Sequence, residues 1–224
     1  MMELKDLELF KGFSNEDFKE IEPYFSLKRY KKKELIFTEG ETPDWFCIVT
    51  GGKVKMTKFS TDGKELILEI IQAGGPFGGI AVLQGFPYPA NAVAMENTDI
   101  CRVSRKNLLR LLDRFPELMS FMGAILGQRM KNSHEMMKNI ALERVESRIA
   151  SLLLKLADKT AVPYDSGGLL IDIKLTKQDI ADMVGTTVET SIRTMSKFKR
   201  EGLIDDAQGK VLILDKKGLQ CYAA

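Results

Sequence analysis

The feature that most constrains the fold of this chain is a stripe of residues at heptad spacing between positions 119 and 140. Its members are separated alternately by four and three residues, which is the spacing of the contact face of a coiled coil. A helix with such a stripe needs a second helix, or a surface of its own domain, to cover it. We predict the seam of a parallel homodimer, and a helix packed on its own domain is the alternative. The seam residues are Met119, Gly123, Leu126, Met130, Ser133, Met137 and Ile140.

The segment before the stripe has the pattern of an antiparallel β-domain. Short runs rich in β-branched and aromatic residues recur about every ten residues between turn signals, as in a small sandwich or barrel. Asp62-Gly63 is a hairpin signal between two such runs, and Ser14 is expected to cap a helix that extends to Phe25. A further helix follows the last run. The predicted strands span residues 35–38, 45–50, 54–59, 66–71, 90–94 and 100–104.

The segment after the stripe has the spacing of a helix-turn-helix. Thr176 and Asp179 form a capping signal for one short helix, Gly185 supplies a turn, and a second helix follows directly. A helix over residues 146–157 is predicted before this motif, and two short strands around residues 208–210 are predicted to form a wing after it. A small helical bundle is the alternative.

The second helix of this motif carries side chains suited to DNA on the face opposite its apolar residues. Ile192, Met195 and Phe198 are predicted to form its buried side. A glutamate can accept a hydrogen bond from cytosine, an arginine can donate two to guanine, and lysines suit phosphates. The predicted exposed residues are Thr187, Glu189, Thr190, Arg193, Lys197 and Arg200.

Composition narrows the functional classes. The formal net charge is only +2, from 33 basic and 31 acidic residues, so DNA binding must rest on the local motif. Cys47, Cys101 and Cys221 lack the spacing of a disulfide framework, a zinc site or an iron–sulfur cluster. A single histidine and no phosphate loop argue against an enzyme. With no secretory signal and no apolar run of about 18 residues, the expected location is the cytoplasm, without membrane association.

The order of these three parts is similar to that of the CRP/FNR family of bacterial transcription regulators. The most specific motifs are NIALERVESRIASLLL and TKQDIADMVGTTVETSIRTMSKFKREGLI. The resemblance implies an α+β fold. It implies an effector-sensing antiparallel β-roll of jelly-roll type over residues 1–115, a dimerisation helix and hinge over 116–144, and a winged helix-turn-helix DNA-binding domain over 145–224. The implied partners are palindromic double-stranded DNA, a second copy of the chain, RNA polymerase and an effector.

The resemblance also implies roles for individual residues at the DNA. Glu189 and Arg193 are expected to read a G·C pair, and Val188 matches the oxygen-regulator branch of the family. Ile192 departs from that branch, which usually has serine there, so the outer base of the half-site does not carry over. The expected phosphate contacts come from Thr176, Lys177, Gln178 and Lys210.

The sensor segment departs further from the family. Relatives that bind cyclic AMP carry a glutamate at the position of Gly79, and an arginine followed by serine or threonine within residues 89–92. This chain has no charged residue between Gly78 and Ala92. A buried cyclic phosphate would lack its guanidinium partner, so we predict that the effector is not cyclic AMP. The candidate effector residues are Gly78, Gly79, Ile80, Ala81, Ala90, Asn91, Ala92, Ser133 and His134.

The sequence leaves the identity of the effector open. His134 is the only histidine, and it is either an ordinary surface residue or the axial ligand of a haem that senses a diatomic gas. Another small molecule is the remaining option, because the cysteines argue against an iron–sulfur cluster. A competing function is a sensor whose winged helix binds protein; steep salt dependence of duplex binding would distinguish the two.

Overall fold

The computed structural model describes residues 3–164 and 167–223. The chain divides into two compact units, the first ending at Met130 and the second beginning at Lys131. Helix α4 (Glu117–Leu142) starts in the first unit, ends in the second, and lies inside the predicted segment 116–144. No helix in the described ranges is long and apolar enough to cross a membrane.

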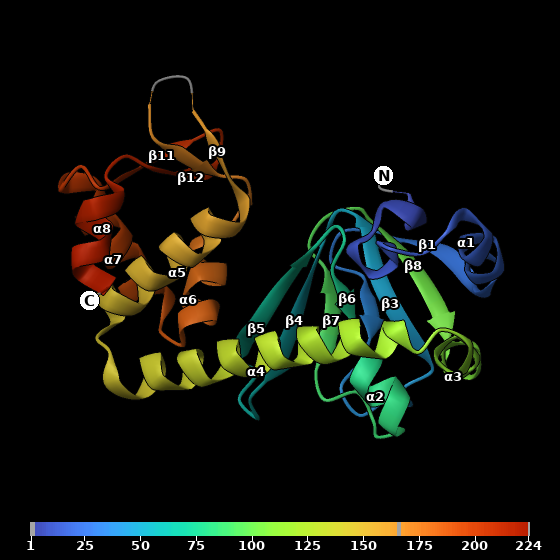
Figure 1. Cartoon of the computed structure of the whole chain (residues 1–224). Helices are drawn as coiled ribbons and strands as arrows, with labels where there is room; N and C mark the ends of the chain where they lie inside the picture. The colour runs from blue at the N-terminus through green and yellow to red at the C-terminus, as the bar shows by residue number, and fades with distance from the viewer. Residues whose placement is uncertain (1–2, 165–166, 224) are drawn as a thin grey trace. The chain divides into compact units, whose positions relative to one another are not determined.

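The N-terminal unit contains two four-stranded antiparallel sheets (Figure 1). One has the strand order β1-β8-β3-β6 and the other β2-β7-β4-β5. This arrangement confirms the predicted α+β fold with an N-terminal β-roll. The strands are β1 (Phe25–Tyr30), β2 (Leu35–Phe37), β3 (Trp45–Gly51), β4 (Lys53–Phe59), β5 (Glu65–Gln72), β6 (Pro76–Phe77), β7 (Asn91–Ala94) and β8 (Thr98–Ser104). The helices are η1 (Leu4–Asp6), η2 (Glu8–Phe10), α1 (Asn15–Ile21), η3 (Glu22–Tyr24), α2 (Gly79–Gln84) and α3 (Arg105–Arg114).

Aromatic side chains pack against one another in the interior of the roll. The Phe37 ring stacks on Tyr88, with centroids 3.7 Å apart. The Tyr88 hydroxyl donates to the carbonyl of Trp45 at 2.8 Å and accepts from the Trp45 amide at 3.0 Å. Burial raises the pKa of Tyr88, so its hydroxyl stays protonated and keeps donating. The ring thereby links β2 and the start of β3 to the segment before β7.

The predicted helix from Ser14 to Phe25 is wrong after Ile21. Ser14 caps α1 in a capping box with Asp17, as predicted, but α1 ends at Ile21. Pro23 follows within a 3-10 turn, because proline cannot continue the helical hydrogen bonds. Phe25 is therefore the first residue of β1, a strand that the sequence pattern missed because most of its residues are exposed.

Helix α4 packs on the roll with a face different from the predicted seam. Leu118 is buried, and Phe121 and Met122 pack against the roll core. Arg129 donates to the Glu69 carboxylate at 2.9 Å and to the Pro76 carbonyl at 2.6 Å. The seam side chains remain exposed, with exposed fractions for Met119, Leu126, Met130, Met137 and Ile140 of 49%, 45%, 58%, 58% and 43%. Their own chain therefore does not cover the stripe.

The C-terminal unit combines four helices with a four-stranded antiparallel sheet of order β11-β12-β10-β9 among its described residues. Ile149, Leu153, Ile180 and Phe198 lie in its interior. Helix α8, which sequence reasoning missed, closes the unit through Leu219 and the Tyr222 ring. The elements are α5 (Val145–Thr160), β9 (Ala161–Pro163), β10 (Leu169–Ile171), α6 (Lys177–Val184), α7 (Val188–Arg200), β11 (Ile204–Ala207), β12 (Lys210–Ile213) and α8 (Lys216–Ala223).

Candidate functional site

The turn between α6 and α7 is fixed by side-chain caps. The Thr176 hydroxyl accepts from the Asp179 amide at 3.0 Å, and the Asp179 carboxylate accepts from the Thr176 amide at 2.8 Å, so the predicted capping box is present. Gly185 ends α6 with a left-handed φ of 67°. Thr187 caps α7, because its hydroxyl accepts from the Thr190 amide at 3.3 Å. These contacts set the direction in which α7 leaves the turn.

The exposed face of α7 differs from the predicted one at Ile192. Ile192 is 47% exposed, whereas Ser191 and Thr194 are buried with Met195 and Phe198. Ser191, Met195 and Phe198 follow one another at intervals of four and three, so they share one side and Ile192 must turn away from it. The prediction of Ile192 as a buried residue is therefore wrong. The exposed residues of the helix are Glu189, Ile192, Arg193, Ser196, Lys199 and Arg200.

Glu189 and Arg193 lie one turn apart on this exposed face, as the sequence predicts. Within the described part of the chain, Arg193 forms no ion pair. Thr190 and Lys197 lie at the flank instead. The Thr190 hydroxyl accepts from Thr187 at 3.1 Å, and the Lys197 ammonium lies 3.8 Å from Glu146 and over the Tyr222 ring.

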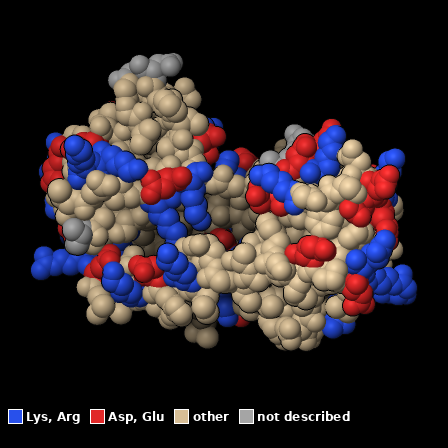
Figure 2. All heavy atoms as spheres, viewed as in Figure 1, with Lys and Arg blue, Asp and Glu red and all other residues tan. Residues whose placement is uncertain are grey.

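The candidate phosphate contacts are held by partners within the unit. Lys177 lies 3.8 Å from Asp206, and Lys210 forms an ion pair with Asp172. The Gln178 side-chain amide donates to Asp182 at 2.7 Å. Figure 2 shows acidic and basic side chains interspersed on the face in view, in keeping with a net charge near zero. Sequence reasoning identified these cations but not their carboxylate partners, which come from distant positions in the chain.

The sensor segment 78–92 lies within the N-terminal unit. Gly78 has a left-handed φ of 78° and precedes α2 as its N-cap, and Gly79, the first residue of the helix, is buried. A Cβ atom at Gly79 would lie 2.8 Å from the Met122 methyl carbon and 3.0 Å from the Phe46 ring. No carboxylate side chain fits there without movement of its neighbours. The position at which relatives carry glutamate is thus filled by core side chains.

Most of the remaining predicted effector residues of segment 78–92 are buried in the core of the roll or hydrogen-bond to its backbone. Ala81, Ala90 and Ala92 are buried, whereas Ile80 is 39% exposed. The Asn91 amide accepts from the Glu39 backbone at 3.0 Å and donates to the Thr57 carbonyl at 3.3 Å. Asn91 therefore bridges two backbone segments. The residues present do not fit a cyclic phosphate bound in the manner that the resemblance implies.

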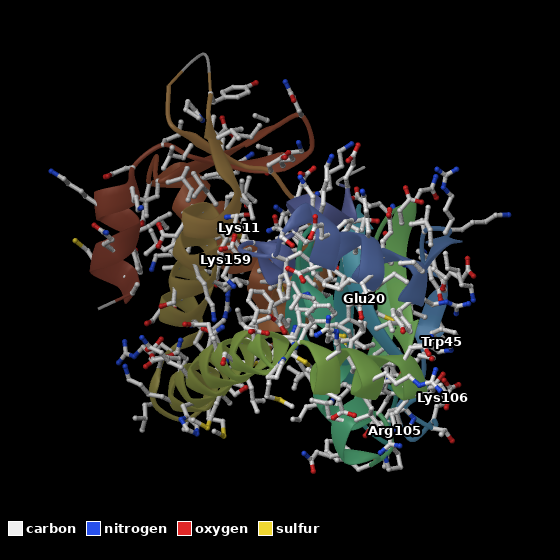
Figure 3. The ribbon with its side chains drawn as sticks, turned by 45° about the vertical axis from the view of Figure 1, so that its right-hand side comes forward. Lys11, Glu20, Trp45, Arg105, Lys106 and Lys159 are labelled. Atoms are coloured by element: carbon white, nitrogen blue, oxygen red, sulfur yellow. The ribbon has the colours of Figure 1, made fainter. Side chains whose placement is uncertain are left out.

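One residue that sequence reasoning missed holds α2 in place. Arg105, labelled in Figure 3, donates from its Nε atom to the Val82 carbonyl at 2.7 Å. It thereby satisfies a carbonyl at the C-terminal end of α2. No local sequence signal identifies this contact, because it joins residues far apart in the chain.

Ser133 and His134 are exposed residues of α4 and belong to the C-terminal unit. The described residues contain no cluster of three or more histidine, cysteine, aspartate or glutamate side chains that could hold a metal ion. Burial raises the pKa of the Cys47 thiol to about 12 and that of Cys101 to about 11, so both stay protonated at neutral pH. Cys221 is exposed.

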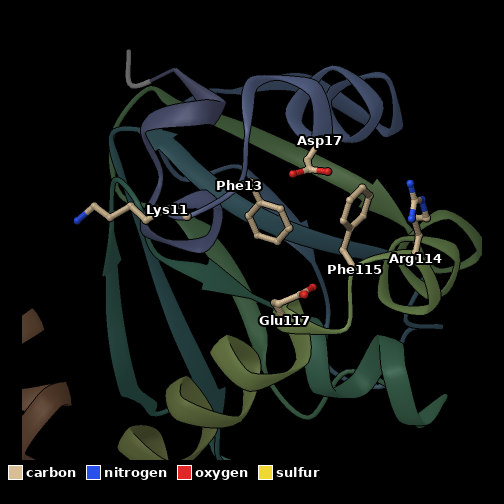
Figure 4. Close-up of a pocket in the computed structure, with 7 residues that line it drawn as sticks. Lys11, Phe13, Asp17, Arg114, Phe115 and Glu117 are labelled. Atoms are coloured by element: carbon tan, nitrogen blue, oxygen red, sulfur yellow. The ribbon is translucent and has the colours of Figure 1, made fainter.

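A separate pocket opens on the N-terminal unit, outside the sensor segment (Figure 4). It encloses about 360 Å³ between the first helices and the junction of α3 and α4. Three of its charged residues have structural partners. Lys11 forms an ion pair with Glu8, and Arg114 donates to the Glu20 carboxylate at 3.1 Å. Asp17 completes the capping box of α1 with Ser14, and these hydrogen bonds lower the pKa of its carboxyl. Its lining residues are Lys11, Gly12, Phe13, Asp17, Arg114, Phe115 and Glu117.

A β-roll, a long helix with an uncovered stripe, and a winged helix-turn-helix with an exposed Glu-Arg pair define a DNA-binding transcription regulator. Residues 27–115 match the cyclic nucleotide-binding domain family, and residues 147–222 match the Crp-like helix-turn-helix domain family. The chain belongs to the CRP/FNR family of transcription regulators.

Individual relatives agree with this assignment. The chain is 30% identical to the cAMP-activated global transcriptional regulator CRP of Haemophilus influenzae, over 84% of this chain and 83% of the relative. Its fold matches that of FixK2 from Bradyrhizobium japonicum with a TM-score of 0.80 at 21% identity, covering 89% and 98% of the two chains. The CO-dependent transcription factor CooA from Carboxydothermus hydrogenoformans is 26% identical, covers 100% and 99%, and gives a TM-score of 0.52.

Proposed function

We propose that the protein acts as a homodimer that reads a palindromic DNA site with helix α7. The observation that carries this proposal is the exposed pair Glu189 and Arg193, one turn apart on a helix anchored by Met195 and Phe198. Glutamate accepts from the cytosine amino group, and arginine donates to guanine O6 and N7 in the major groove. Selection of binding sites from a random duplex library tests it, and failure to enrich any palindrome would contradict it.

The uncovered stripe on α4 supports the homodimer. Five large apolar side chains of the stripe are exposed in the single chain, and a second copy supplies an identical stripe. A two-fold dimer would place its recognition helices about one duplex turn apart, roughly 34–36 Å, so the half-sites should occupy successive major grooves. By resemblance, each half-site contains a TGA-like core. Val188 has no hydrogen-bonding group and should favour a thymine methyl beside that core.

We expect cyclic AMP at millimolar concentration to leave both the melting temperature and the DNA affinity unchanged. The physical reason is that Met122 and Phe46 fill the space at Gly79, and no guanidinium lies in segment 78–92 to pair with the phosphate. A ligand stabilises a protein only as far as it occupies the folded state. Thermal denaturation and duplex-binding titrations, each with and without cyclic AMP, measure these two quantities, with a cyclic-AMP-activated relative as positive control. Isothermal titration calorimetry measures binding of the nucleotide itself, and micromolar binding would overturn the expectation.

The effector that we propose instead is either a haem with a diatomic gas, for which His134 is the candidate axial ligand, or another small molecule. The support for haem is the exposure of the only histidine on α4 and the likeness to a CO-dependent regulator. We expect the purified protein to take up haem, and His134→Ala to change the ferric absorption spectrum. The Ser133→Ala variant is the control for local disturbance of the helix. An identical spectrum for His134→Ala and the parent would remove His134 from the coordination sphere.

A further inference from the structure

Asp206, on the first strand of the wing, contacts two lysines of the helix-turn-helix. Its carboxylate accepts from the Lys199 ammonium at 2.9 Å and lies 3.8 Å from the Lys177 ammonium. The neighbouring Asp205 also reaches Lys199, at 2.9 Å. Lys177 is the first residue of α6, Lys199 lies in the last turn of α7, and Asp206 belongs to β11. One carboxylate therefore joins all three elements of the winged motif.

This carboxylate has the charge and the acceptor oxygens of a DNA phosphate. Lys177 belongs to the turn where the proposed mode of binding places a phosphate, so Asp206 and the duplex would use the same cation. The contact is exchangeable, because half of the Asp206 side chain and more than a third of each lysine side chain are exposed. Exposed ion pairs of this kind are weak and screened by salt. Asp206 also adds a negative charge where the polyanion would approach.

We propose that Asp206 is an internal competitor for backbone phosphate, which holds Lys177 and Lys199 in the free protein and lowers the affinity for all duplexes alike. The inference rests on the proposed DNA-binding function of α6 and α7. An acid that is bonded to a phosphate-binding lysine is ordinarily expected to position that lysine and so to assist DNA binding. We propose the opposite role for Asp206. The two roles predict opposite signs when the charge is removed.

The test is Asp206→Asn, which keeps the shape of the side chain and removes its charge. Binding is measured by fluorescence anisotropy with a random-sequence duplex and with the selected operator, between about 50 and 200 mM salt. We expect the variant to bind both duplexes roughly two- to tenfold more tightly at low salt, with the gain shrinking as salt rises. The salt slope should steepen by about one unit, and the ratio between the two affinities should stay the same.

Two further variants separate a local effect from a general one. Asp158→Asn removes a similarly exposed acid, paired with Lys216 at 2.8 Å between α5 and α8, and it should leave DNA affinity unchanged. Asp206→Glu keeps the charge and should bind like the parent protein. Weaker or unchanged binding by Asp206→Asn would overturn the proposal, as would an equal gain in Asp158→Asn. If the parent protein binds neither duplex, it is the DNA-binding function itself that fails.

Discussion

Met130→Glu is expected to convert the proposed dimer into monomers. Met130 lies in the middle of the α4 stripe and is 58% exposed in the single chain, so the folded monomer accommodates a carboxylate there at little cost. In the dimer, two carboxylates would face each other in an interface that excludes water. Burying a charge without a partner costs about 3–5 kcal/mol, which corresponds to a rise in the dimer dissociation constant of roughly two to four orders of magnitude.

Sedimentation velocity over a range of protein concentrations measures this change. Ala124→Glu is the matched control, because it introduces the same side chain at an exposed position of α4 outside the stripe. The control should remain dimeric and bind DNA normally. A Met130→Glu protein that sediments like the parent and retains its DNA affinity would show that the stripe is not the intermolecular contact.

Arg193→Ala is expected to cost about 1–3 kcal/mol of binding free energy at the operator and to relax selection at a single guanine. Arg193 is exposed on α7 and, within the described ranges, forms no ion pair. Its loss therefore leaves no buried charge behind in the protein. The change should appear as a loss of sequence information at one position of each half-site rather than as a uniform weakening.

Site selection from a random duplex library, carried out in parallel with the parent protein, measures this loss. Arg200→Ala is the control, since it removes an exposed arginine at the end of the same helix, far from the Glu189 turn. The control should weaken all sequences alike through lost phosphate attraction. If Arg193→Ala and the parent enrich the same palindrome with the same preference at the guanine, the assignment of Arg193 is wrong.

The elements that the sequence predicted well are those with a local signal. Thr176 and Asp179 signal the start of α6 because both halves of a capping box lie within four residues. The runs of the roll signal strands because they are rich in β-branched and aromatic residues and lie between turn signals. Strand β1 has no β-branched residue, and the two residues of β6 are too few to show any pattern. Helix α8 does have a local signal, because the Asp215 carboxylate caps it by accepting from the Gly218 amide at 3.0 Å, and sequence reasoning missed this cap.

Two exposed residues of the candidate site could be predicted from the sequence, but the ion pairs of its lysines could not. Glu189 and Arg193 follow from helical spacing alone. The apolar character of Ile192 predicts burial, but Ile192 lies on the exposed side of the helix and Ser191 occupies the buried side. The partners of Lys177 and Lys210 lie about 30 to 40 residues away, and only the folded chain brings Asp206 and Asp172 to them. Distance in the sequence thus limits which contacts can be inferred.

The close packing around Gly79 limits what a substitution at this residue could add to the sensor domain. The Met122 methyl group and the Phe46 ring occupy the space that a side chain at residue 79 would need. A glutamate acquired there would meet these neighbours before it could meet a ligand, and a guanidinium near Ala90 would still be missing. A single substitution at residue 79 would therefore displace core side chains and still leave a cyclic phosphate without its guanidinium partner.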